Sequence, residues 1–150
     1  MSLVYLQELS LALEKQLFWL DYSYQQVKDL SSPDKFSIEE FNQFENLCSR
    51  YVRTIDFLVR KYFRCLDVEF ENQGTLMDVV NNAHKRGLFL DIESTRQNKD
   101  IRNEIVHEYL DDALQSVFAD VLKTSPDLLA IGRNALQYSQ RYIRAKDTQS

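Results

Sequence analysis

The chain has 150 residues, of which 44% are hydrophobic and 27% are charged. This length and balance predict a single globular domain over residues 1–145 with a core large enough to fold alone, followed by a polar tail at 146–150 that we expect to be frayed. The net charge of -5 excludes a bulk electrostatic attraction to nucleic acid, so any RNA contact must come from a local basic patch.

Signals for membranes, secretion and metals are missing from the sequence. It has no run of about 18 apolar residues that would cross a membrane, and its first five residues lack the basic and apolar regions of a secretory leader. Cys48 and Cys65 fall in one predicted helix at a separation of roughly 25 Å, too far for a disulfide, so we expect reduced cysteines and a cytoplasmic protein. Two histidines, two cysteines and three glycines form neither a metal-ligand pattern nor a phosphate loop, so no metal or cofactor is expected.

The first predicted helix covers residues 3–29. Its apolar residues recur at steps that place them on one helical face, with Ser10 as the one polar interruption: Leu3, Leu6, Leu13, Leu17, Leu20, Tyr24 and Val27. The polar turn at 31–34 is expected to end this helix.

The second predicted helix begins at Ser37, because Glu40 lies three residues later and completes a capping box. No helix breaker follows before Gly74, so this helix is expected to reach about residue 70. One side is apolar and comprises Leu47, Tyr51, Ile55, Leu58, Val59, Tyr62 and Leu66. The opposite side carries a basic stripe, which consists of Arg50, Arg53, Arg60, Lys61 and Arg64. The stripe can follow an RNA backbone or meet an acidic partner, and a plain solvated face is the simpler alternative.

The remaining segments also favour helices. A short third helix is expected from Thr75 to about Arg86, and a fourth from Asp91. A fifth should run from about residue 111 to 123, and Ser125 should cap either a sixth helix or a bent continuation that ends near Ala145. No strand-type alternation of useful length appears. The predicted fold class is therefore all-α, an antiparallel up-and-down bundle of five to six helices.

The fourth predicted helix carries the most informative motif of the chain, Arg102-Asn103-Glu104-Ile105-Val106-His107-Glu108-Tyr109. At ~100° per residue, Arg102 falls near the middle of an apolar stripe formed by Ile101, Ile105, Val106 and Tyr109. A permanent cation in that position is costly unless a partner, a cleft or water receives it. The motif is therefore interpreted as a candidate site.

The residue types of this motif suit a phosphodiester substrate. The guanidinium of Arg102 can hold phosphate oxygens, and the imidazole of His107 can transfer a proton. Asn103 lies four residues before His107, on the same helix face. A buried polar tie between helices remains the alternative, since an isolated arginine and histidine are weak evidence for catalysis.

The motif resembles the Arg-(four to six residues)-His signature of the HEPN superfamily, and its extension through Tyr109 looks like that of HepT toxins from HEPN/minimal-nucleotidyltransferase operons. The upstream run Gly74-Thr75-Leu76-Met77-Asp78-Val79-Val80, followed by Ala83 and Gly87-Leu88, is similar to nucleotidyltransferase substrate-binding relatives. The resemblance covers roughly residues 40–125.

This resemblance implies a HEPN-like bundle that dimerises with the motif helices of two protomers facing one cleft. It implies a metal-independent endoribonuclease toxin in which Arg102 and His107 are the catalytic pair and Asn103 assists them. Tyr109 would accept AMP from a partner nucleotidyltransferase, which silences the toxin. The alternative implied function is a non-catalytic subunit that binds nucleotide or substrate for the nucleotidyltransferase. A structural helical dimer is the third possibility.

Overall fold

In a computed structural model, the described residues are 3–65, 85, 100–103, 105 and 111–149. Every regular element among them is helical, which confirms the all-α class for the part of the chain that is described. Most of the predicted third helix and most of the predicted fourth helix lie outside these residues, so five to six helices in a HEPN-like arrangement stay a prediction.

The first helix, α1, spans Leu3–Val27 and ends close to its predicted end. Its buried face comprises Leu6, Leu9, Leu13, Leu17, Leu20, Ser23 and Val27. Five of the seven predicted positions are among them, whereas Leu3 and Tyr24 are only partly buried. Ser10 is accommodated because its hydroxyl donates to the carbonyl of Leu6 at 2.8 Å. The polar interruption is thus satisfied within the helix itself.

The second helix, α2, spans Ile38–Phe57 and follows a 3-10 turn, η1, at Pro33–Lys35. The predicted capping box is confirmed. The Glu40 amide donates to Ser37 Oγ at 3.1 Å, and the Ser37 amide donates to Glu40 Oε1 at 3.0 Å. Two backbone donors at the helix start are satisfied in this way, which fixes the point at which α2 begins.

The helix continues beyond Phe57 with a change of winding. A π-helical turn, η2, covers Leu58–Tyr62, and helical backbone follows as far as Cys65. A π turn places one additional residue in the turn and rotates everything after it relative to a regular helix. The sequence pattern predicted an uninterrupted α-helix here, and this local winding is the difference. Cys48 and Cys65 are both buried, and they are not joined by a disulfide.

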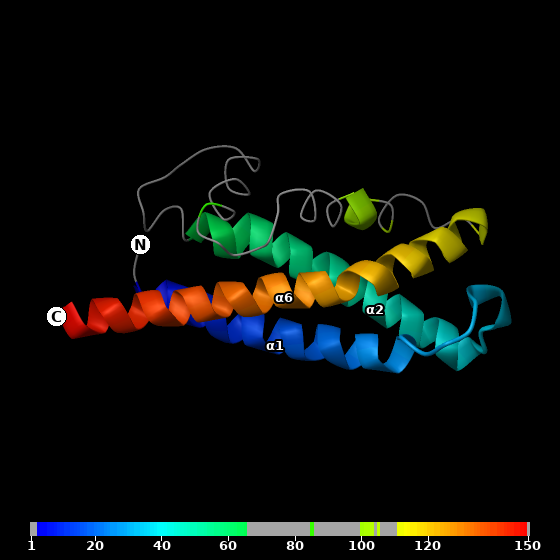
Figure 1. Ribbon diagram of the computed structural model, residues 1–150, viewed down its shortest axis with the longest axis horizontal. Helices are drawn as coiled ribbons and strands as arrows, with labels where there is room; N and C mark the ends of the chain where they lie inside the picture. The colour runs from blue at the N-terminus through cyan, green and yellow to red at the C-terminus, as the bar shows by residue number, and fades with distance from the viewer. Residues whose placement is uncertain (1–2, 66–84, 86–99, 104, 106–110, 150) are drawn as a thin grey trace.

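The last helix, α6, runs without interruption through Asp111–Gln149, with Pro126 inside it. Of the two alternatives that the sequence left open, a separate helix starting at Ser125 is wrong and a continuation of the preceding helix is confirmed. The continuation extends through Gln149 instead of ending near Ala145. Ser125 does not cap a helix, because its hydroxyl donates back to the carbonyl of Val121 at 2.6 Å. Proline and such back-bonded hydroxyls both bend helices, and the axis of α6 changes direction within its first half (Figure 1).

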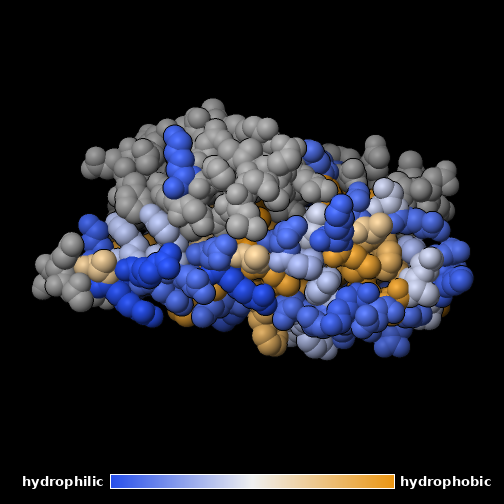
Figure 2. All heavy atoms as spheres, viewed as in Figure 1, coloured by the Kyte–Doolittle hydropathy of each residue, from blue (hydrophilic) through white to orange (hydrophobic). Residues whose placement is uncertain are grey.

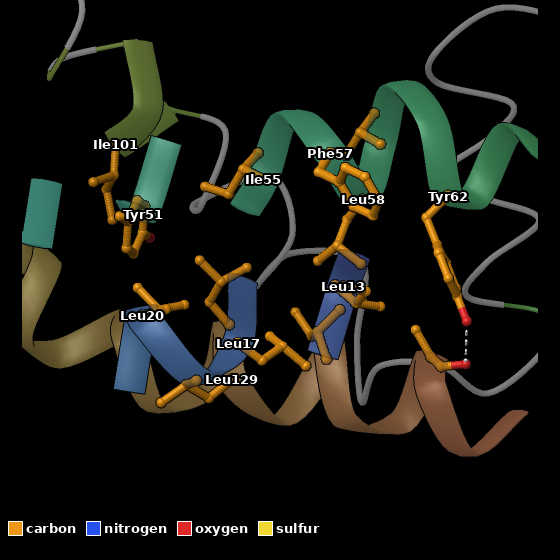
Figure 3. Close-up of a cluster of buried hydrophobic side chains, with 14 of the residues drawn as sticks. Leu13, Leu17, Leu20, Tyr51, Ile55, Phe57, Leu58, Tyr62, Ile101 and Leu129 are labelled. Carbon is orange, nitrogen blue, oxygen red and sulfur yellow. Dashed lines mark hydrogen bonds between the residues drawn. The ribbon is translucent and has the colours of Figure 1, made fainter. Parts of the chain in front are cut away.

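The three long helices pack together along the length of the molecule (Figure 1). α1 runs in one direction, and α2 and α6 return in the other. The core lies between them and takes Leu13, Leu17 and Leu20 from α1, Tyr51 and Ile55 from α2, and Leu129 from α6 (Figure 3). Gly132 lies at a close approach of α6 to α1, because a Cβ there would overlap the side chain of Leu17.

Two tyrosine hydroxyls are buried in this core, and both have partners on α6. Tyr51 Oη lies 2.7 Å from Thr124 Oγ1. Tyr62 Oη donates to the carbonyl of Ala135 at 3.1 Å and is hydrogen-bonded to Ser139 (Figure 3), while Ser10 Oγ of α1 lies 3.3 Å away. Burial raises the pKa of both phenols, because the charged phenolate would be removed from water.

Candidate functional site

The arginine of the predicted motif is held by α2. Arg102 lies on a short helical piece beside Ile101, which is buried in the core. Its Nε donates to Asp56 Oδ1 at 3.0 Å and its Nη2 donates to Asp56 Oδ2 at 3.1 Å. This bidentate pair is partly accessible, since the Arg102 side chain is 24% exposed and the Asp56 side chain 34%. The paired geometry fixes the plane of the guanidinium.

Asp56 is the partner that receives the Arg102 cation, which lies on an otherwise apolar stripe. The stripe itself is confirmed where it is described, because Ile101 is buried and Ile105 packs against the core. Arg102 finds its counter-charge within the same chain, 46 residues away in sequence. Its position therefore does not by itself require a dimer interface, which removes the physical reason for the expected cleft between protomers.

Asn103 is the second motif residue that the structure brings to the guanidinium. Nη1 of Arg102 donates to its Oδ1 at 3.2 Å, and Asn103 is exposed. Three of the five N–H groups of the guanidinium are used in these bonds. Two N–H groups remain that no described residue accepts, and they are the donors through which Arg102 can bind an anion. His107 and Tyr109 lie outside the described residues.

The basic stripe of α2 divides into two parts. Arg60 and Lys61 are exposed on the π turn, and Arg64 is partly buried. Arg50 packs against α1, because its Nη1 donates to Ser23 Oγ at 2.5 Å and its guanidinium carbon lies 4.9 Å from the centre of the Trp19 ring. That geometry is a cation–π contact, which orders the side chain. The stripe is therefore more than a solvated face at its N-terminal end.

A pocket of about 370 Å³ opens between α1 and α2 beside Arg50. Its described lining comes from both helices and comprises Lys15, Gln16, Trp19, Arg50, Arg53 and Thr54. Three of these side chains are cationic and none is a carboxylate, although the whole chain is acidic. Within the described residues, Lys15 and Arg53 have no hydrogen-bond or ion-pair partner. The pocket is thus a local basic patch. Because the chain as a whole is acidic, an anionic ligand needs such a patch to be attracted.

Gln16 contributes a buried acceptor to the same pocket. Its Oε1 is shielded from solvent and accepts no hydrogen bond from the described residues. Leaving a buried polar group unpaired typically costs about 1–3 kcal/mol, so such a group calls for an explanation. Gln16 is also one of the residues that line the pocket.

The flank of α1 next to the pocket exposes aromatic rings. Phe18, Trp19 and Tyr22 are 61%, 47% and 48% exposed and pack edge to face in sequence order. In the view of Figure 2 most of the described surface is hydrophilic, and an apolar side chain protrudes along the edge where α1 lies. Exposed rings beside cations are typical of surfaces that bind bases and phosphates.

Sequence reasoning missed both Asp56 and the contribution of α1. No local signal links Asp56 to Arg102, because their pairing depends on how two distant segments pack. On α1, the sequence placed Lys15 and Trp19 outside the predicted apolar face but did not mark them as binding residues. Nothing in the sequence pattern pointed to Gln16. The basic stripe was the one clue, since it includes Arg50 and Arg53, which line the pocket.

The described residues hold no group of three histidine, cysteine, aspartate or glutamate side chains placed to bind a metal ion. Among those same residues, no helix is both long and apolar enough to cross a membrane. No protein-family model, no curated protein and no solved structure matches the chain. The functional assignment therefore depends on the motif, on the Asp56–Arg102 geometry and on the pocket.

Proposed function

We propose that the chain is a HEPN-type, HepT-like toxin that cleaves RNA without a metal ion. The observation that carries the proposal is the Arg102–His107–Tyr109 motif, combined with an Arg102 guanidinium that is oriented by Asp56 and Asn103 and keeps two N–H groups for an anion. A pre-oriented guanidinium stabilises charge that develops on a phosphate without having to reorganise.

The proposed reaction uses the 2′-hydroxyl of the substrate ribose as the nucleophile. His107 accepts the hydroxyl proton as the 2′-oxygen bonds to the adjacent phosphorus. The bond from phosphorus to the 5′-oxygen of the next nucleotide breaks, and that oxygen takes up a proton. Arg102 stabilises the negative charge on the phosphate oxygens, and Asn103 helps to orient the guanidinium. The products are a cyclic phosphate and a free 5′-hydroxyl.

The proposed regulation uses Tyr109, two residues after His107. A partner nucleotidyltransferase transfers AMP to the phenol oxygen, which adds a bulky anion next to the imidazole. The added phosphate competes for Arg102 with the phosphate of the substrate. The active form is proposed to be a homodimer, which light scattering tests directly, because a strict monomer at micromolar concentration contradicts it.

A second candidate function is a non-catalytic subunit that binds nucleotide for a nucleotidyltransferase. The observation that favours it is the same ion pair, because Asp56 already neutralises Arg102 in the described state and the chain is acidic overall. In this role the Arg102–Asp56 pair is a structural tie between helices.

Expression in a bacterial host separates the two candidates. The toxin proposal predicts growth arrest with the wild-type chain, relief in His107→Ala, and relief in Arg102→Lys because lysine cannot present a planar fork. Co-expression with a cognate nucleotidyltransferase should add the mass of AMP to the wild-type chain but not to Tyr109→Phe. Arrest by His107→Ala at wild-type strength contradicts the proposed mechanism, and AMP addition to Tyr109→Phe contradicts the proposed acceptor.

A further inference from the structure

The pocket between α1 and α2 combines features that converge on one ligand class. Lys15, Arg50 and Arg53 line it with three cations and no described carboxylate. Lys15 and Arg53 form no ion pair with any described residue, so both charges can be offered to a ligand. An anion with several charged oxygens is the ligand that such an arrangement attracts.

One wall of the pocket is aromatic as well as cationic. The guanidinium of Arg50 lies over the Trp19 ring, and its bond to Ser23 holds it in that position. Phe18 and Tyr22 extend the aromatic surface on both sides of Trp19 along α1. Nucleobases stack on aromatic rings and on guanidinium planes, and this stacking tolerates any base. The wall therefore favours a planar ring in addition to the anion.

The pocket also supplies an acceptor for a neutral donor. Gln16 Oε1 is buried and unpaired within the described residues, so a ligand N–H or O–H group can satisfy it. A ribose hydroxyl or an exocyclic amino group of a base has this property, whereas an ionised carboxylate side chain does not. The volume of about 370 Å³ falls within the range of small-ligand pockets.

We infer that this pocket binds a nucleotide unit, with its phosphate on Lys15 and Arg53, its base against the Trp19–Arg50 wall, and one of its donors on Gln16. This site goes beyond the proposed cleavage, since binding here requires neither Arg102 nor His107. The nucleotide can be free or can be one unit of a single RNA strand, because both present the same chemistry.

The chain contains a built-in probe for this test. Trp19 is its single tryptophan and lines the pocket, so tryptophan fluorescence, excited selectively over the tyrosines, reports on this site. Titration of the full chain with AMP, and separately with a short single-stranded oligoribonucleotide, should change the Trp19 emission in a saturable way. Tighter binding of AMP identifies the free nucleotide as the ligand, and tighter binding of the oligoribonucleotide identifies the strand.

Matched variants distinguish the pocket from general charge effects. Arg53→Gln should weaken binding at least about tenfold, as loss of a charged phosphate contact implies. Arg141→Gln removes the same charge from an exposed position on α6 outside the pocket lining and should bind like the wild type. Circular dichroism should show the same helix content in both variants. The inference is overturned if neither titrant changes the emission at millimolar concentration, or if Arg53→Gln and Arg141→Gln bind equally well. Failure here leaves the growth-arrest test of RNA cleavage unaffected.

Discussion

On the side of α2 and η2 that faces α6, the buried hydroxyls of Tyr51 and Tyr62 are hydrogen-bonded across the core. On the flank that faces α1, Arg53 and the buried Gln16 Oε1 have no partner among the described residues. Paired buried groups stabilise one packing arrangement, whereas unpaired groups in a pocket are available to a ligand. The difference separates polar groups that are paired within the fold from polar groups that remain available to the ligand we propose.

The largest effect of a single hydroxyl is expected at Tyr62. Tyr62→Phe keeps the ring but removes the partner of the Ala135 carbonyl and of Ser139, so the free energy of unfolding should fall by about 1–3 kcal/mol. Urea denaturation measures this change. Tyr22→Phe on the exposed flank is the control and should change stability by about 0.5 kcal/mol or less. Equal losses in the two variants would contradict the distinction between the two sides of α2.

Alkaline pH should weaken the same side of α2. Burial raises the folded-state pKa of Tyr51 and Tyr62 above the ordinary value of 10.0, so the folded chain retains these protons more tightly than the unfolded chain. Their contribution to stability is complete below about pH 10 and is lost as the pH rises through the folded-state pKa, at about 1.4 kcal/mol per pH unit for each tyrosine. Urea denaturation between pH 9 and 11 should show this slope. A slope that is unchanged in Tyr51→Phe and Tyr62→Phe would argue against it.

A smaller effect is expected where α2 meets Arg102. Asp56→Asn removes the ion pair, but both side chains reach water, so the loss of stability should be at most about 1 kcal/mol and should shrink in 1 M salt. Asp21→Asn is the matched control, because Asp21 and Arg133 form a looser pair at 3.8 Å with more exposed side chains. If Asp56→Asn lowers the free energy of unfolding more than Tyr62→Phe does, the Asp56–Arg102 ion pair, and not the tyrosine hydrogen bonds, is the main polar stabiliser.

Short-range features of this fold were predictable from the sequence, and long-range ones were not. The capping box at Ser37 and Glu40 was predictable because both partners lie within one turn. The apolar residues of Leu58–Tyr62 fit an α-helical turn and a π-helical turn equally well. The sequence pattern therefore did not predict the π winding. Ser125 and Pro126 resemble a helix start, but the packing of α6 against α1 and α2 keeps one helix continuous through them.

In the candidate site, too, short-range features were predictable from the sequence and long-range ones were not. The motif itself identified Arg102 and Asn103, which do meet. The carboxylate that holds Arg102 and the α1 wall of the pocket depend on how helices far apart in sequence come together, which no local pattern encodes.

The most direct test of the account is cleavage of RNA by the purified chain in the presence of EDTA, measured for the wild type and for His107→Ala. The account predicts cleavage by the wild type with cyclic phosphate and 5′-hydroxyl ends, and loss of at least about a hundredfold in rate in His107→Ala, whose helix content by circular dichroism should be unchanged. Cleavage by His107→Ala at the wild-type rate, or wild-type cleavage that EDTA abolishes, would contradict it.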